Sequence, residues 1–435
     1  MNRRLALAAI CSLLAMTGCQ APPTPRSVLV IVVDTLRADH LGVYGHQLPT
    51  SPQIDAWAES GIVFERAYST SPWTLPSVAS LLTGKRPRTH GAGQLTDRGG
   101  RAELADGVAS VAEAFSAAGW STGAIVANPH LSARFGLDRG FATYDDSLAR
   151  QPWTARRAET VIERAMGWLE KHAEERFFLL VHLIDPHLSY DPPSPFRGAF
   201  TNGEASSRNV RLGVVRTALA AGDSSRLPFL AAAYDEEIAY VDSQLGRLRE
   251  FLRNTGLDRS TLVVLTSDHG EEFGEHGSFE HGHTLFDEVL RVPLIIWHPA
   301  FDGERRRRAV SLQDLAATLL DATGASPASG WGQSLLGSRS GDAPLVAEST
   351  LYGEQQQAVI SPPWKLILGS ETGSVQLFRL DRDPAESINL AAEHPKIVTQ
   401  LSATLGSDSG AAGDRPPVKL DEAARRELEA LGYLQ

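Results

Sequence analysis

The feature that most constrains this chain is a set of three apolar runs, each followed by an aspartate. Continuous runs rich in Val, Leu and Ile are typical of strands buried on both faces of a parallel sheet. The runs are Val28–Val33 before Asp34, Phe177–Ile184 before Asp185, and Leu262–Leu265 shortly before Asp268. Ligands of open α/β sheets bind at the carboxyl ends of the strands. We therefore expect the three acids to converge on one crevice.

Helical patterns separate these runs and predict a doubly wound, mostly parallel α/β sheet across residues 28–325. After Gly324 the pattern changes to short strands with turns between them, and it ends in a capped amphipathic helix. Residues 326–435 are therefore predicted to form a small antiparallel α+β subdomain with a terminal helix. The expected helices lie near 155–173, 228–253, 311–322 and 421–431, and further strands near 121–127, 292–297, 344–348, 364–368 and 375–380.

Residues 1–19 have the pattern of an export signal. Two arginines precede an apolar stretch that is too short to span a bilayer, and small residues then precede Cys19, which resembles a bacterial lipobox. We expect lipidation of Cys19, with residues 20–27 as a Pro-rich tether and no transmembrane helix in the mature chain. The protein would then face the periplasm from the inner or outer membrane. The alternative is an ordinary secretion signal with an incidental cysteine.

The amino-acid composition argues against cysteine-based sites and against a nucleic-acid partner. Cys11 and Cys19 are the only cysteines, so the mature chain has no disulfide, no Cys-ligated zinc and no cysteine nucleophile. The chain carries 41 basic and 52 acidic side chains, a formal charge of −11, and lacks the basic footprint of a non-specific nucleic-acid binder. We therefore expect no nucleic-acid partner.

Converging carboxylates repel one another unless a cation lies between them. The segment 266–283 adds four histidines to the acids, and Asp268 and His269 are its strongest candidate ligands. Mixed carboxylate and imidazole ligands favour zinc or manganese, with calcium as an alternative. The competing interpretation is that each acid only caps the helix that follows it.

Several segments together resemble the sulfatase family of the alkaline phosphatase superfamily. They occur in the expected order and cover nearly all of the mature chain. These segments are Val33–Asp39, Leu81–Gly84, Ser267–Glu271, Arg291–Pro293, Leu377–Asn389 and Leu428–Leu434.

The resemblance places Thr74 at the nucleophile position and Val78 where sulfatases carry an arginine. Sulfatases use a formylglycine made from Cys or Ser, and threonine cannot yield that aldehyde. Phospho-transferring relatives use an unmodified Thr, whose hydroxyl becomes a better nucleophile when a metal lowers its pKa. Without the resemblance, Thr74 would more simply be a helix cap.

The resemblance also implies a ligand set for one or two divalent ions, formed by Asp34, Thr74, Asp268 and His269. Other matching positions would bind substrate or a second ion. They are Asp185, His187, His281, its fallback His283, and Asn128.

The resulting hypothesis is a metal-dependent hydrolase of small or glycan anionic esters that acts through a covalent Thr74 intermediate. Phosphate or phosphonate esters are favoured, because a sulfated threonine is hard to resolve. The alternatives are a sulfuric ester hydrolase, a lipoprotein that binds sulfated glycans without cleaving them, and a phosphoethanolamine-type transferase.

Overall fold

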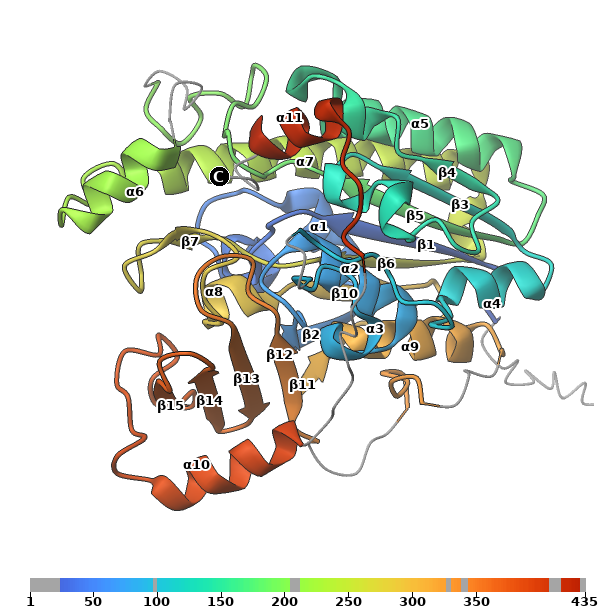
Figure 1. The fold of residues 1–435 in the computed structure, drawn as a ribbon. Coiled ribbons are helices and arrows are strands. Elements are labelled where there is room, and N and C mark those ends of the chain that lie inside the picture. The colour runs from blue at the N-terminus through green and yellow to red at the C-terminus, as the bar shows by residue number, and fades with distance from the viewer. Residues whose placement is uncertain are drawn as a thin grey trace, which may run out of the picture.

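The computed structural model describes residues 24–96, 100–203, 212–325, 330–337, 343–406 and 416–430. Its main unit is built on one sheet of nine strands, in the order β11-β2-β10-β6-β1-β5-β3-β4, with β9 paired to β2 (Figure 1). The strands are β1 Ser27–Val33, β2 Ile62–Tyr68, β3 Ser121–Val126, β4 Thr143–Asp145, β5 Phe177–Leu183, β6 Thr261–Ser267, β9 Arg291–Val292, β10 Leu294–Trp297 and β11 Glu304–Ser311.

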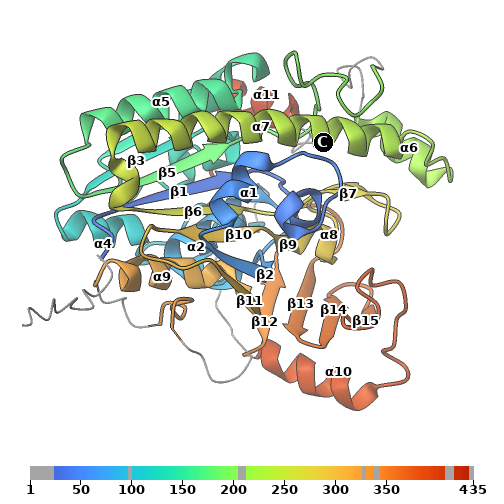
Figure 2. The same ribbon diagram turned by 180° about the vertical axis from the view of Figure 1, so that it is seen from behind.

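Helices cover both faces of this sheet. Figures 1 and 2 show α1, α5 and α7 on one face and α2, α4 and α9 on the other. Since β10 and β9 are antiparallel to their neighbours and the other pairs are parallel, the predicted doubly wound, mostly parallel fold is confirmed. The helices of the main unit are α1 Pro52–Ala58, α2 Thr74–Thr83, α3 Pro87–His90, α4 Val111–Ala117, α5 Ala158–Lys171, α6 Leu212–Ala220, α7 Leu227–Thr255, α8 Asp287–Leu290 and α9 Leu315–Ala322.

The register of the three central strands decides which side chains meet at their ends. Val32 of β1 pairs with His182 of β5 and with Thr266 of β6. Side chains alternate between the faces of a sheet, so His182 stands on the same face as residues 34 and 268. The same alternation puts residue 185 on the opposite face, towards α5.

The small antiparallel sheet after α9 is also confirmed, and α10 packs against it. It consists of four strands, one of which, β13, has a polar start and was not predicted. The terminal helix α11 instead contacts the 3-10 turn Pro129–Leu131 of the main unit. These elements are β12 Leu345–Glu348, β13 Gln356–Ser361, β14 Trp364–Gly369, β15 Val375–Arg379, α10 Pro395–Ser402 and α11 Glu422–Ala430.

The predicted lipidation site, Cys19, lies outside the described residues. Within the part of the chain that the structure describes, no helix is both long enough and apolar enough to cross a bilayer.

A buried ion pair joins the small sheet to the main unit. Lys365 of β14 is fully buried, and its Nζ lies 2.7 Å from Asp287 Oδ1 and 2.8 Å from Glu386 Oε1. Asp287 begins α8, so the lysine neutralises acids from both units. Removing one member of such a group leaves uncompensated charge in the interior.

We predict that Lys365→Met lowers the free energy of unfolding by about 3–5 kcal/mol, as breaking a buried ion pair does. The matched control is Arg379→Met on the neighbouring strand, because the ion pair of Arg379 with Asp381 is partly exposed. This variant should lower the free energy of unfolding by about 1 kcal/mol or less. Urea denaturation followed by circular dichroism measures both. Equal losses for the two variants would contradict the assigned role of Lys365.

Candidate active site

Three buried side chains meet at the carboxyl ends of the central strands. Asp34, His182 and Asp268 offer ligand atoms that all lie within 4.8 Å of one another. His182 Nε2 is 3.8 Å from Asp34 Oδ2 and 3.6 Å from Asp268 Oδ2, and the three side chains have no solvent exposure. This geometry follows directly from the strand register.

The polar atoms of this cluster are not satisfied by the protein alone. Asp34 Oδ1, Asp268 Oδ2 and both nitrogens of His182 are buried without a hydrogen-bond partner. Burial, together with the nearby charge of Asp268, raises the pKa of Asp34 well above its ordinary value. Burial also acts to raise the pKa of Asp268, but the imidazoles of His269 and His182 outweigh it and lower that pKa. Buried, unpaired oxygens and nitrogens aimed at one point fit a divalent cation.

His269 turns one nitrogen towards the same point. Its Nδ1 lies 3.0 Å from the carbonyl oxygen of Gly270, which can only accept, so Nδ1 carries the hydrogen. Nε2 therefore presents a lone pair, 3.6 Å from both Asp34 Oδ1 and Asp268 Oδ2. A lone pair facing two carboxylates is unfavourable unless a cation lies between them, which again indicates a metal site.

Thr74 joins this cluster from the other side. It is the first residue of α2, fully buried, and its Oγ1 lies 3.3 Å from His269 Nε2. The amide of Asn128 donates to Asp34 Oδ2 at 2.7 Å and to Thr74 Oγ1 at 3.3 Å. The structure thus brings together Thr74 and the other three expected metal ligands, with Asn128 bridging between them.

Local backbone constraints hold these groups in place. Thr35 has a φ of 56°, which is strained for a β-branched residue, and the Tyr234 hydroxyl donates to its carbonyl oxygen at 2.7 Å. Ser77 of α2 donates to the carbonyl oxygen of Asp268 at 2.5 Å, which fixes the helix to the end of β6. Gly270 is required because a Cβ there would lie 2.0 Å from the carbonyl oxygen of Glu288.

Two further predicted histidines line the same centre. The ring of His281 lies 4.4 Å from that of His269 and 5.0 Å from that of His187. His281 Nδ1 is 2.9 Å from Glu271 Oε1, and the Tyr190 hydroxyl donates to the other oxygen of Glu271. Burial raises the pKa of Glu271 and lowers that of His281, so it disfavours the charged form of each side chain. Burial also lowers the pKa of His187 to about 4.

The structure places the other two predicted residues outside this cluster. Asp185 Oδ2 accepts from the backbone N–H of Ala158 at 2.7 Å and thereby caps the first turn of α5. Burial raises the pKa of Asp185 to about 6. His283 Nε2 accepts from Arg216 at 2.9 Å, and its ring stacks on Tyr352.

His182 is the member of the centre that the sequence analysis did not single out. It is the sixth residue of an otherwise apolar strand, FFLLVHL, and every residue of that strand is buried. A histidine in a fully buried central strand needs polar partners. A histidine in this apolar run, three residues before Asp185, was therefore the available signal.

The main unit also has a cavity of about 280 Å³, whose lining among the described residues includes no residue of the centre itself. His130, two residues after Asn128, contributes to its wall, and the Trp73 ring packs edge-on against that histidine at 5.2 Å. Arg101 also lines the cavity, and its guanidinium lies 5.2 Å from the Trp73 ring. The remaining wall is mostly apolar and comes from Leu95, Gly100, Phe135, Leu351, Tyr352, Val418, Leu420 and Leu428.

The mostly parallel α/β sheet and the buried centre at its strand ends fit a metal-dependent ester hydrolase. Residues 26–325 match the family model described as Sulfatase, so the chain belongs to the sulfatase family. Members of this family generally bind a divalent metal, which agrees with the buried ligand groups described above. The resemblance found in the sequence is thereby confirmed.

Curated relatives with similar sequences are named as sulfatases. The chain is 25% identical to an arylsulfatase of Clostridium perfringens over 84% of its own length and 90% of that protein. It is 23% identical to human N-acetylgalactosamine-6-sulfatase, covering 72% of this chain and 65% of that protein.

Solved structures share the fold. A phosphonate monoester hydrolase of Agrobacterium radiobacter superposes with a TM-score of 0.71 at 22% identity, covering 88% of this chain and 94% of that one. A 2-O GAG sulfatase superposes with a TM-score of 0.72 at 22% identity, covering 88% of this chain and 91% of that one.

We predict that Asp34→Asn weakens binding of zinc or manganese at least about 100-fold, because it removes a charged ligand from the centre. Asp185→Asn is the matched control, since an amide oxygen can still cap α5 and this side chain lies outside the cluster. Metal content after dialysis, measured by mass spectrometry, distinguishes the two variants. A comparable loss in Asp185→Asn would show that the ligand set is wrong.

Proposed function

We propose that this protein hydrolyses phosphoric or phosphonic esters through a covalent intermediate on Thr74. The observation that carries the proposal is the position of the Thr74 hydroxyl. It is fully buried, 3.3 Å from His269 Nε2, and in the same cluster as Asp34 and Asp268.

The residues divide the work of the reaction. Asp34, His182, Asp268 and His269 would hold zinc or manganese, whose charge would favour ionisation of the Thr74 hydroxyl. The Asn128 amide orients that hydroxyl by donating to it. Because Thr74 begins α2, the N–H groups of the first helical turn have no intrahelical acceptor and favour an anionic substrate.

In the first step, Thr74 Oγ1 forms a bond to phosphorus while the bond to the leaving oxygen breaks. His281 is the proposed proton donor to that oxygen, because Glu271 holds its Nδ1 by a 2.9 Å contact and its ring lies 4.4 Å from that of His269. Water then attacks the phosphothreonine and returns one proton to His281, the Thr74–phosphorus bond breaks with Thr74 leaving as the alkoxide that began the reaction, and free phosphate or phosphonate is released.

Phosphorus is favoured over sulfur by the nucleophile itself. Threonine cannot be converted to formylglycine, and Val78, at the position of the usual supporting arginine, is an apolar side chain buried in α2. An unmodified threonine suits a phosphoryl intermediate, which water can resolve at phosphorus. Apolar walls and Arg101 in the cavity lined by His130 suit an anionic ester with an apolar leaving group.

The second candidate is sulfuric ester hydrolysis. It is favoured by the activities named for the curated relatives, an arylsulfatase and N-acetylgalactosamine-6-sulfatases. For either substrate, we further propose that the protein is exported and held at the cell envelope by a lipid on Cys19, on the basis of the lipobox pattern.

A panel of aryl sulfates, phosphate diesters and monoesters, and phosphonate monoesters tests the preference. With manganese or zinc added, we expect the largest kcat/KM on a phosphorus ester. Thr74→Ala should lower kcat at least about 1000-fold, while Thr74→Ser, which keeps a hydroxyl, should retain far more activity. Faster turnover of aryl sulfates would favour the second candidate, and an active Thr74→Ala would exclude a covalent threonine intermediate.

Leaving-group dependence tests the role of His281. A proton donor matters most for a basic leaving group, so His281→Ala should slow alkyl esters about 100-fold and nitrophenyl esters much less. His283→Ala is the control, because that ring is held by Arg216 and Tyr352 away from the centre. If both leaving groups slowed equally in His281→Ala, the histidine would bind substrate without donating a proton.

A further inference from the structure

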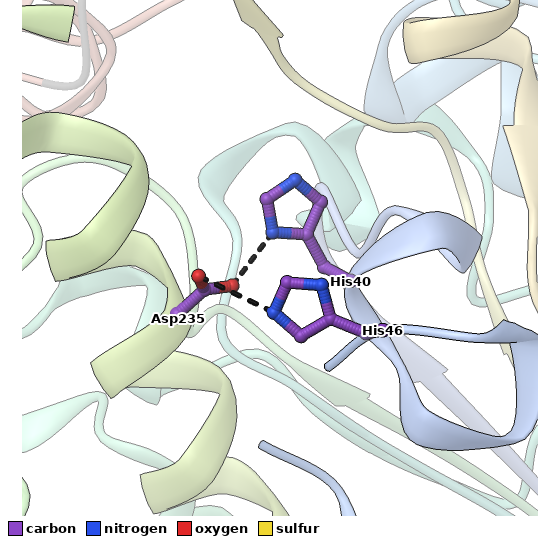
Figure 3. A group of neighbouring side chains, drawn as sticks. All are labelled: His40, His46 and Asp235. Carbon is purple, nitrogen blue, oxygen red and sulfur yellow. Dashed lines mark hydrogen bonds and ion pairs between the residues drawn. The ribbon is translucent and has the colours of Figure 1, made fainter. Parts of the chain in front are cut away.

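A second cluster of metal-binding side chains is formed by the loop that follows Asp34 and by α7. We propose that His40, His46 and Asp235 bind a transition metal, with zinc as the best fit, at a site separate from the active centre. Figure 3 shows both imidazole rings directed at the Asp235 carboxylate, which projects from α7. This inference does not depend on the proposed function.

The spacing of the three side chains fits one ion. Their ligand atoms all lie within 4.8 Å of one another. His40 Nδ1 is 2.6 Å from Asp235 Oδ1, and His46 Nε2 is 3.4 Å from Asp235 Oδ2. Zinc bonds to nitrogen and oxygen of about 2.0 Å in a tetrahedral site separate neighbouring ligand atoms by about 3.3 Å. Small side-chain rotations are therefore enough to admit the ion.

The chemistry of the ligands selects the ion. Two imidazoles and one carboxylate are typical of zinc and similar transition metals, whereas calcium takes oxygen ligands and magnesium keeps its water. Three protein ligands leave the fourth position to water. His46 Nε2 is buried without a hydrogen-bond partner and faces the carboxylate, which leaves it suited to accept a metal.

The site is accessible, although it is mostly enclosed. The side chains of His40 and His46 are 13% and 19% exposed, and Asp235 is 6% exposed. The imidazole rings of His40 and His46 stack with their centroids 5.1 Å apart, so they already lie face to face. An ion can enter from solvent without rearrangement of the core.

The position of the cluster explains what bound metal would do. Tyr234, next to Asp235 on α7, donates to the carbonyl oxygen of Thr35 and accepts from the backbone N–H of Arg37. Thr35 is the strained residue that follows the catalytic Asp34. A metal bound by His40, His46 and Asp235 would attach this loop to α7 at a second point. It would thereby help to hold Asp34 in place.

Metal counting in a variant that lacks the active-centre ligands tests the proposal. The full-length Asp34→Asn/Asp268→Asn variant is stripped with a chelator, reloaded with zinc, desalted and analysed by mass spectrometry. We expect one zinc per chain, and an increase in Tm on zinc addition. His46→Phe, which keeps a stacked ring but removes the nitrogen, should weaken that zinc at least about 100-fold. The control is His172→Ala, a histidine paired with one carboxylate, Glu175.

The outcomes separate clearly. Zinc retained in the background variant and in His172→Ala, but lost in His46→Phe, supports the site. No zinc in the background variant, or equal zinc in His46→Phe, would overturn it. If the background variant does not fold, the same count in the otherwise unchanged protein decides the matter, because His46→Phe must then bind one zinc fewer while hydrolytic activity remains measurable.

Discussion

The structure depends on two carboxylates, Asp34 and Asp268, that are buried side by side at the ends of adjacent parallel strands. Two carboxyl groups so close together cannot both be ionised in an apolar interior unless a cation compensates their charge. His182 adds ring nitrogens that have no hydrogen-bond partner, and His269 turns its Nε2 towards the same point. The whole centre is therefore arranged for an ion, and the nucleophile, its orienting amide and the neighbouring histidines are placed around that point.

Residues outside the centre hold this cluster of buried polar groups in place. The Tyr234 hydroxyl holds the strained Thr35, Ser77 ties α2 to the end of β6, and Gly270 lets the chain pass close to Glu288. The proposed second metal site joins His40 and His46 to Asp235, the residue after Tyr234 on α7. Long-range hydrogen bonds and the proposed metal ligation would thus act on the same loop, which follows the first acid of the centre.

The sequence was sufficient for the fold class and for the family, because both follow from apolar runs, helix spacing and motif order. It could not give the register of β5 against β1, and register alone shows that His182 faces the centre while Asp185 faces α5. It also left β2, β4, β11 and β13 unpredicted, since these strands are short or carry charged and polar residues. The His40–His46–Asp235 cluster joins residues almost 200 positions apart, which no local pattern indicates.

The most direct test of the central account is the stereochemical outcome at phosphorus. A substrate made chiral by oxygen isotopes is hydrolysed, and the configuration of the released product is determined. Attack by Thr74 followed by attack of water comprises two in-line displacements, so we predict net retention of configuration. Net inversion would show that water attacks the substrate directly, and would contradict a covalent role for Thr74.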